Sequence, residues 1–273
     1  MPRTSHDAPA RSLSTRTMDV LGAFTPARPE LTLSELARAA RLSLTTTHRI
    51  VADLVAWGAL ERGVDGRIRV GLRLWEVASL APRTLPLRER ALPAMEALYE
   101  TTHENVQLAV REDLEVVWIE RLSGPESVRV LTRVAARFAL HSTGAGLVLL
   151  AHAPPEVREQ ALGTRLRRWT EHTITDPVRL RAVLAEVRRT GVAVSDRQVT
   201  ADAVSVAVPV RDPDGVVAAV SVVMHADGPL SVATVTPAVR AAGLAISRAL
   251  GAPASATAPT HHGGDRRRPS RPA

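Results

Sequence analysis

The chain has 273 residues, of which 45% are hydrophobic and 3% aromatic, and it contains no cysteine. This length suffices for one large or two modest domains with a core built mostly from Leu, Val and Ala. The lack of cysteine excludes disulfides and thiolate zinc sites. No run of about 18 apolar residues occurs, which excludes a transmembrane helix. The first 16 residues contain no apolar signal segment, so we expect a cytoplasmic protein without a membrane partner.

The formal net charge is +7, and all 35 residues counted as Lys or Arg are arginine. Such an excess is typical of proteins that bind a polyanion. It is also typical of soluble proteins with an arginine-rich composition. The charge alone therefore leaves both interpretations open.

Both ends of the chain have the composition of disordered segments. Residues 1–14 are rich in Pro, Ser and Arg and contain few apolar residues, so we expect a disordered N-terminal arm. Residues 252–273 are basic and low in complexity, which predicts a disordered basic tail.

Three short helices are predicted between residues 15 and 58. Apolar residues at helical spacing indicate the first helix over residues 16–24. Thr32 is followed three residues later by Glu35, a capping-box pattern that predicts the start of the second helix. Ser43 is the expected N-cap of the third helix.

A hairpin is predicted directly after the third helix. Asp65-Gly66 lies between two short runs of alternating apolar and polar residues, which is a strong hairpin signal. Helix, helix, short turn, helix and two-stranded ribbon together outline a winged helix-turn-helix domain over residues 15–79. Such a domain binds DNA through its third helix, and an alternative use is as a module for protein contacts.

The third helix has two different faces when its residues are placed at about 100° per residue. The inner face is apolar, apart from Thr47 beside it, and consists of Ile50, Val51, Leu54 and Val55. The outer face near the N-terminus is small, hydroxylated and cationic, and it carries Thr45, Thr46, His48 and Arg49.

This outer face is suited to DNA. The amides at a helix N-terminus accept a phosphate, and threonine hydroxyls bond phosphates or base edges. Arg49 can reach guanine O6 and N7, and arginines of the hairpin can hold the DNA backbone. The alternative is an ordinary solvated first turn, but the capped helix, short turn and hairpin together favour DNA. The predicted DNA contacts are Ser43, Thr45, Thr46, His48, Arg49, Arg62, Arg67 and Arg69.

The remaining sequence predicts linker helices over residues 80–103 and a second domain over residues 104–251. Pro93 either begins a new linker helix or kinks a continuous one. Strand patterns cover 105–111, 115–122, 127–134, 192–196, 204–212 and 216–225, and helix patterns cover 141–153, 156–162, 176–191 and 236–250. Strands in hairpins flanked by helices predict an α+β domain with a mainly antiparallel sheet.

Two parts of the sequence resemble the IclR family of bacterial transcriptional regulators. The first part is LSELARAARLSLTTTHRIVADLVAWGALER followed by RIRVGLRLWEVAS. The second consists of LHSTGAGLVLLA, GVAVSD and VSVAVPVRDPDGVVAAVSVVM. The resemblance spans about residues 16–250 and implies a winged-helix domain, a linker helix and an effector-binding domain with a GAF-like α/β fold.

The resemblance also implies partners. Members of the family form dimers or dimers of dimers, bind double-stranded operator DNA and respond to small metabolites, often organic acids or aromatic compounds. A homodimer is also the default on physical grounds, because one winged helix rarely provides enough specificity.

The resemblance further implies an effector pocket in the second domain. The turn at Gly144 opens a helix whose amides can meet a carboxylate. Either Ser195 or Asp196 is implied to line the pocket. Val223 stands where the family often has a polar residue, which indicates a less polar ligand. The implied pocket residues are Leu140, Gly144, Ala145, Asp196, Ser205, Ser221 and Val223.

Common catalytic motifs do not occur in the sequence. We find no G-x-S-x-G elbow, no H-E-x-x-H, no P-loop and no G-x-G-x-x-G after a strand. We therefore expect a regulator, in the first place a repressor, rather than an enzyme, without metal or cofactor. A GAF-like domain with hydrolytic activity is the alternative.

Overall fold

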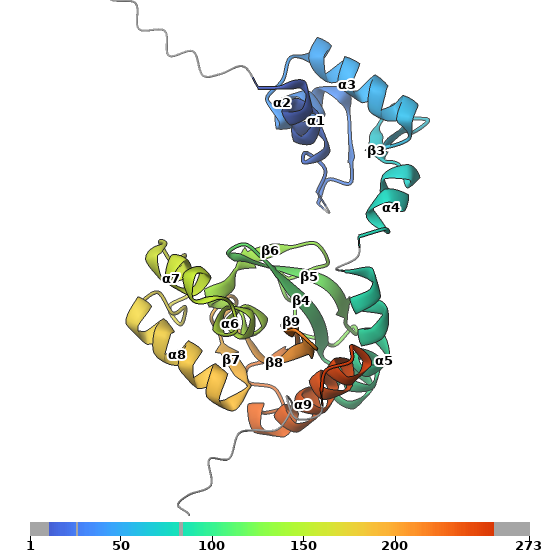
Figure 1. The fold of residues 1–273 in the computed structure, drawn as a ribbon. Helices are drawn as coiled ribbons and strands as arrows, with labels where there is room; N and C mark the ends of the chain where they lie inside the picture. Colours follow the sequence, from blue (N-terminus) through green and yellow to red (C-terminus); the bar gives the residue numbers. More distant parts are fainter. Residues whose placement is uncertain (1–10, 26, 82–83, 254–273) are drawn as a thin grey trace, which may run out of the picture. The chain divides into compact units, whose positions relative to one another are not determined.

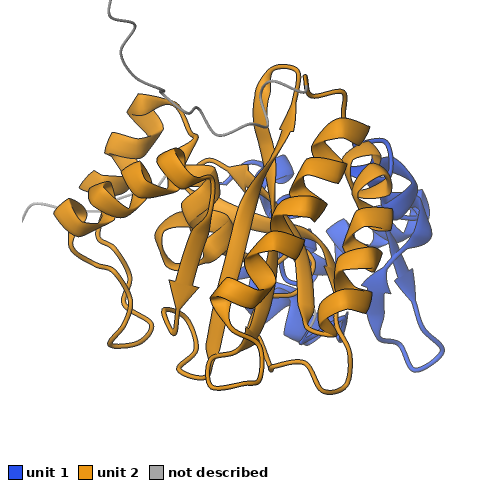
Figure 2. Cartoon of the chain, turned by 90° about the horizontal axis from the view of Figure 1, so that it is seen from below, with its two compact units in different colours: residues 1–85 blue, residues 86–273 orange. Residues whose placement is uncertain are grey.

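The structure is a computed structural model that describes residues 11–25, 27–81 and 84–253. The chain divides into two compact units, residues 1–85 and 86–273 (Figure 2). Most of the expected N-terminal arm and basic tail lies outside the described residues.

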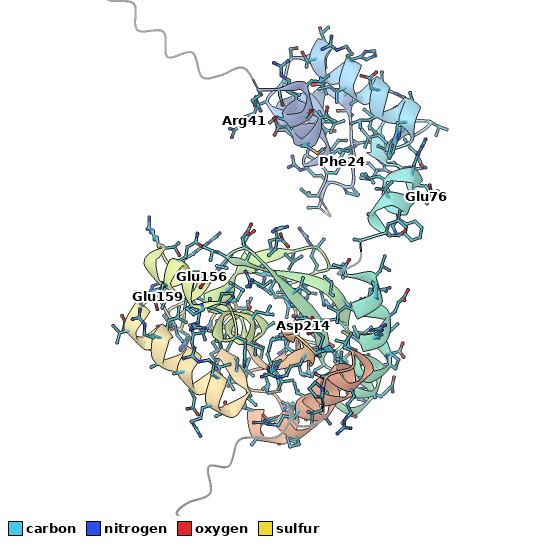
Figure 3. All side chains as sticks on the ribbon, in the orientation of Figure 1. Phe24, Arg41, Glu76, Glu156, Glu159 and Asp214 are labelled. Atoms are coloured by element: carbon cyan, nitrogen blue, oxygen red, sulfur yellow. The ribbon has the colours of Figure 1, made fainter. Side chains whose placement is uncertain are left out.

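Unit 1 has the element order of a winged helix-turn-helix domain, as the sequence predicts (Figure 1). Its elements are α1 (Leu13–Leu21), β1 (Glu30–Leu31), α2 (Leu33–Ala40), α3 (Leu44–Trp57), β2 (Leu60–Arg62), β3 (Ile68–Val70) and α4 (Leu72–Ala78). The turn between α2 and α3 is three residues long and begins at Arg41, which Figure 3 labels.

The core of unit 1 is the apolar face that the sequence pattern predicts. The buried side chains that meet there come from α1, α2, α3 and the strands, and they include Val20, Leu36, Ile50, Val51, Leu60 and Ile68. Leu54 and Val55 pack against this cluster from the end of α3.

The start of α1 lies earlier than the sequence predicts. The Ser12 hydroxyl accepts a hydrogen bond from the Thr15 N–H at 3.1 Å, and Arg11 forms an ion pair with Asp19 at 2.7 Å. Because these contacts cap and brace the first turn, Leu13 and Ser14 are helical rather than part of a disordered arm.

The ribbon of the winged domain has three strands, so the prediction of two strands was wrong. The order is β1-β3-β2, and Glu30 of β1 lies opposite Arg69 of β3. β1 has only two residues, which is too short to show an alternating pattern.

The capping box that the sequence predicts at α2 is present. The Thr32 N–H donates to Glu35 Oε2 at 2.7 Å, and the Glu35 N–H donates to Thr32 Oγ1 at 3.3 Å. The hydrogen bonds from the Thr32 N–H and hydroxyl hold the pKa of the Glu35 carboxyl below its usual range.

The remaining chain forms an α+β fold. Its elements are α5 (Leu85–Thr102), β4 (Asn105–Glu112), β5 (Glu115–Leu122), β6 (Arg137–Ala139), the 3-10 turn η1 (Leu140–Ser142), α6 (Gly144–Ala151), α7 (Pro155–Gly163), α8 (Pro177–Thr190), β7 (Ala193–Asp196), β8 (Ala203–Asp212), β9 (Gly215–His225) and α9 (Val232–Ala249).

Six strands form one antiparallel sheet in the order β6-β5-β4-β9-β8-β7. Helices α6, α7 and α8 cover one face of this sheet, and α5 and α9 cover the other (Figures 1 and 2). Each face carries its own apolar cluster. Unit 2 is therefore a three-layer structure around an antiparallel sheet, in agreement with the predicted fold class.

Residues 127–134 are not a strand, which corrects the sequence prediction. The short strand β6 pairs with β5 instead, and Phe138 lies opposite Val116. The backbone of 127–134 is tied down by side chains: Asn105 Nδ2 donates to the Val128 carbonyl at 2.8 Å, and Arg121 donates to the Thr132 carbonyl at 3.0 Å.

Two further boundaries differ from the sequence prediction, and the structure also decides the choice that was left open at Pro93. Pro93 lies inside the single helix α5 rather than starting a new one. α9 begins at Val232, four residues before the expected Thr236, because Ser231 caps it. Ala252 is buried and its N–H donates to the Ser247 carbonyl at 3.0 Å, so the structured part includes the first residue of the expected tail.

The described helices include none that is both long enough and apolar enough to span a bilayer.

The capping box makes a prediction about stability. Thr32→Ala removes the cap of α2 and should lower the free energy of unfolding by about 1 kcal/mol. The measurement is the midpoint of urea unfolding. Thr45→Ala is the control, because this exposed threonine near the start of α3 is not an N-cap. Equal midpoints for Thr32→Ala and wild type would contradict the prediction.

Candidate functional site

The threonine run at the start of α3 divides into a capped turn and a buried residue. The Ser43 hydroxyl oxygen accepts a hydrogen bond from the Thr46 N–H at 3.2 Å, and the hydroxyl donates to Thr46 Oγ1 at 2.8 Å. Thr47 is fully buried and donates its hydroxyl hydrogen to the Ser43 carbonyl at 3.0 Å. Ser43 and Thr46 therefore set the helix N-terminus, and Thr47 faces the core as its periodicity predicts.

The outer face of α3 presents free polar groups. Thr45, His48 and Arg49 are all exposed. Among the described residues, neither His48 nor Arg49 has an ion-pair partner. A ligand can therefore bind the Arg49 guanidinium and the Thr45 hydroxyl on this face without first breaking an ion pair within the protein.

The three arginines predicted as wing contacts differ in their surroundings. Arg69 lies 3.2 Å from Glu61 and 3.9 Å from Glu30. Arg67 lies 3.8 Å from both Glu35 and Asp65. The charges of Arg67 and Arg69 are thus locally balanced.

Arg62 is the wing arginine with the freest charge. Its guanidinium donates to the Gly66 carbonyl at 3.4 Å, and it has no carboxylate partner within the described part of the chain. Arg62 is therefore the strongest candidate among the wing residues for a contact with DNA.

The sheet face beneath α6 changes from alanine to polar residues where this helix begins. Ala193, Ala207 and Ala219 are completely buried there, and their small side chains let α6 approach the sheet. One step further along the strands the same face carries hydroxyls: Ser205 lies opposite Ser195, and Ser221 lies opposite Gln107.

Gly144 is the point of closest approach between α6 and the sheet. A Cβ atom at this position would lie 2.7 Å from Ser205 Oγ and 3.3 Å from Ala207 Cβ. The absence of a side chain lets the Gly144 N–H donate to Ser205 Oγ at 3.3 Å. A larger residue would push the helix away from the strands.

The first turn of α6 retains one free amide. The Gly144 N–H is bound by Ser205, and the Gly146 N–H donates to Thr143 Oγ1 at 3.0 Å. The Ala145 N–H is the second amide of the helix, so it has no acceptor within α6, and no side chain of the described residues accepts from it. This amide lies at the positive end of the helix, where an anion is stabilised.

A hollow, here called the cavity, lies at this helix start, and its empty space amounts to ≈ 460 Å³ when the open solvent at its mouth is included. None of the described residues that line it has a charged side chain. The lining residues are Gln107, Trp118, Val130, Leu131, Thr132, Thr143, Gly144, Ala145, Ser195, Gln198, Val199, Thr200, Ala203, Ser205, Ser221 and Val223. Gly144, Ala145, Ser205, Ser221 and Val223 are thus brought together around one space.

Two expected pocket residues lie elsewhere. Asp196 forms an exposed ion pair with Arg197 at 3.0 Å, because successive strand residues face opposite sides of the sheet. Ser195 lines the cavity instead and donates its hydroxyl hydrogen to the Ser142 carbonyl at 2.9 Å. Leu140 is buried in the apolar core and does not line the cavity.

Several lining residues were not expected from the sequence. Gln107 and Trp118 come from β4 and β5, and Val130, Leu131 and Thr132 come from the segment that was expected to be a strand. A polar Gln107 in an otherwise apolar strand was a possible signal. The hairpin of β4 and β5 was expected, but the place of Trp118 beside the cavity also depends on the pairing of β4 with β9, for which local sequence carries no signal.

Buried His141 and half-buried His152 are each hydrogen-bonded to a backbone carbonyl. His141 Nε2 lies 3.0 Å from the Arg167 carbonyl, so this nitrogen carries a hydrogen, and burial lowers the pKa of His141. His152 Nδ1 lies 2.9 Å from the Val148 carbonyl, and burial also lowers its pKa. In the described part of the chain no group of three His, Asp or Glu residues is arranged to hold a metal ion.

Comparison with known families gives two matches. Residues 15–63 match the IclR helix-turn-helix domain. Residues 81–248 match the bacterial transcriptional regulator IclR C-terminal domain.

Individual relatives agree with these matches. The chain is 34% identical over 154 residues to HTH-type transcriptional regulator KipR of Bacillus subtilis (strain 168), a stretch that covers 56% of this chain and 62% of KipR. The match therefore spans less than two thirds of KipR. The chain is 27% identical over 188 residues to transcriptional repressor IclR of Escherichia coli (strain K12), covering 67% of this chain and 69% of that protein.

A solved structure is similar over nearly the whole fold. It is an IclR homologue complexed with 4-hydroxybenzoate from Microbacterium hydrocarbonoxydans, with 41% identity and a TM-score of 0.84, covering 88% of this chain and 99% of that chain. A winged helix-turn-helix unit, a second unit with a cavity at α6, and the two family matches lead to one assignment: this chain belongs to the IclR family of bacterial transcriptional regulators.

Proposed function

We propose that the protein is a sequence-specific DNA-binding repressor in the cytoplasm whose operator binding is controlled by a small organic acid, most specifically an aromatic one. The observation that carries this proposal is the neutral cavity at the start of α6, where one unpaired amide lies among hydroxyl and apolar groups. Its relatives are transcriptional regulators, and we assign it no catalytic role.

The DNA-binding part of the proposal rests on α3. Its N-terminus is capped by Ser43, and its outer face carries Thr45, His48 and Arg49, which have no partner of opposite charge in the part of the chain that the structure describes. An unpaired arginine on the exposed face of a recognition helix suits bidentate contact with guanine. Arg62 of the wing suits contact with a phosphate.

The effector part of the proposal rests on the chemistry of the cavity. The Ala145 amide at the α6 N-terminus provides a place for one carboxylate. Because no charged side chain lines the cavity, a second full charge on the ligand would be desolvated without compensation. Val130, Leu131 and Val223 provide an apolar surface. A monocarboxylic acid with an apolar body fits this arrangement, and the relative with bound 4-hydroxybenzoate supports an aromatic acid.

We also propose a homodimer, or a dimer of such dimers, in which α4 contributes to the contact. Large apolar side chains are exposed at and just after this helix, namely Leu72, Trp75, Val77 and Leu80. Exposed apolar clusters of this kind often mark protein contacts. Two copies would also present two recognition helices to an operator with two half-sites.

The first prediction concerns Arg49. Arg49→Ala should weaken binding to an operator, selected from random DNA with the wild-type protein, by about 1–3 kcal/mol and relax its base preference. The measurement is a titration of the selected and the scrambled duplex at several salt concentrations. The salt dependence of the affinity reports phosphate contacts, so it separates them from contacts with bases.

Arg38→Ala is the matched control for Arg49→Ala. It removes an equally exposed arginine from α2 and should leave the ratio of specific to nonspecific affinity unchanged. If Arg49→Ala weakens binding equally on both duplexes, Arg49 contacts phosphate and not a base.

The second prediction concerns the cavity. Gly144→Val should abolish binding of 4-hydroxybenzoate, because a side chain at this position collides with Ser205. Ser221→Ala should weaken it by about threefold to tenfold through loss of one hydrogen bond. Isothermal titration calorimetry measures both, and DNA binding without ligand should persist.

Ser247→Ala is the control for Ser221→Ala. Ser247 is equally buried but packs in α9 against the opposite face of the sheet. Equal ligand affinity in Ser221→Ala and wild type would show that the Ser221 hydroxyl does not bind the ligand.

The third prediction concerns the dimer. Trp75→Asp places a charge in the exposed apolar cluster of α4 and should shift the protein towards smaller species in sedimentation velocity. Val178→Asp is the control, since Val178 is a similarly exposed apolar residue on α8. An unchanged sedimentation profile for Trp75→Asp would remove α4 from the contact.

A further inference from the structure

We propose that the indole N–H of Trp118 donates a hydrogen bond to the ligand of the cavity, and that it thereby selects acids whose apolar body carries a second hydrogen-bond acceptor. This inference rests on the proposed effector-binding role of the cavity. It adds a specificity-determining residue that no sequence motif indicates.

The indole nitrogen of Trp118 is buried without a partner. Trp118 is 1% exposed and lines the cavity, and its Nε1 has no hydrogen-bond acceptor among the described residues. Buried indole N–H groups usually have one, because an unsatisfied donor is costly. An indole N–H can only donate, so the missing partner must be an acceptor.

Three other polar groups of the cavity are already hydrogen-bonded to protein atoms. Gln107 Nε2 donates to Thr132 Oγ1 at 2.6 Å, and the Ser195 hydroxyl donates to the Ser142 carbonyl. Ser205 Oγ accepts from the Gly144 N–H. Opposite Trp118 on β4 lies Ala109, which has no polar side chain. A ligand atom is therefore the natural acceptor for the indole.

Contacts between aromatic rings, and not a hydrogen bond from its nitrogen, hold the Trp118 indole in position. The Trp118 ring meets Phe138 edge to face, with centroids 5.5 Å apart, and Phe138 stacks on Trp169 at 4.9 Å. The Arg167 guanidinium lies over the Trp169 ring at 3.8 Å. Three of the few aromatic residues in this chain thus form one stack, which pre-organises the donor and lowers the entropy lost when a ligand binds.

This donor complements the free amide of α6. The Ala145 N–H can take the anionic group of the ligand, and the Trp118 N–H can take an uncharged oxygen such as a hydroxyl, ether or keto group. An acid with a purely hydrocarbon body would leave the indole unsatisfied. The cavity should therefore discriminate between two acids that differ in one such oxygen.

Trp169 provides an internal comparison. Its Nε1 is also buried and has no partner within the described ranges, and its ring belongs to the same stack. However, Trp169 does not line the cavity. Replacing either tryptophan by phenylalanine removes one indole N–H and loosens the stack, but only Trp118 belongs to the lining of the cavity.

The test compares 4-hydroxybenzoate with benzoate by calorimetry. Wild type should bind 4-hydroxybenzoate about threefold to tenfold more tightly, the value of one neutral hydrogen bond. In Trp118→Phe the two affinities should become nearly equal, and in Trp169→Phe the difference should persist.

Three outcomes overturn the inference, and they are distinguishable. A preference that persists in Trp118→Phe refutes the donor role and leaves the effector site intact. Loss of the preference in both variants shows that the stack acts only structurally. Failure of wild type to bind either acid at millimolar concentration refutes the proposed aromatic effector, and the inference with it.

A second measurement uses the unaltered protein, in case Trp118→Phe does not fold. The four tryptophans give separate indole signals in a ¹H–¹⁵N spectrum. 4-Hydroxybenzoate should shift the Trp118 indole proton downfield by more than benzoate does, while the Trp169 signal stays in place. A stationary Trp118 signal at saturating 4-hydroxybenzoate would overturn the inference.

Discussion

The close approach of α6 to the sheet at Gly144 is the contact on which the second unit depends. It is possible because Gly144 has no side chain and because the strands carry alanine, chiefly Ala207, beneath the helix. The same contact brings the positive end of α6 onto the serines that follow on the strands. A packing requirement and a binding site therefore share the same few residues.

The recognition helix combines structure and function in a similar way. Ser43 and Thr46 are occupied with starting the helix, and Thr47 is buried beneath it. Only Thr45, His48 and Arg49 remain for an external partner. In the wing, ion pairs with acidic neighbours hold Arg67 and Arg69, which leaves Arg62 as the freer cation. Fewer side chains are therefore available to contact DNA than the number of polar residues in α3 and the wing suggests.

Local patterns predicted the elements well where one segment carried its own signal. The capping box at Thr32, the N-cap at Ser43 and the hairpin at Asp65-Gly66 are all decided by residues within three or four positions. The errors fall where a distant partner decides. Residues 127–134 have an alternating pattern, but β6 takes the place beside β5, so side chains of β4 and β5 hold this segment instead.

The sequence alone determined the two-domain order, the faces of α3 and the small-residue start of α6, because each depends on short-range spacing or on residue size. The tertiary structure decided which side chains share the cavity. Ser195 lines the cavity and Asp196 does not, because successive residues of a strand point to opposite faces of the sheet. Trp118 reaches the cavity because β5 pairs with β4 in a hairpin and β4 pairs with β9. The second pairing joins residues far apart in the sequence, such as Asn105 and Val223, and no local pattern encodes it.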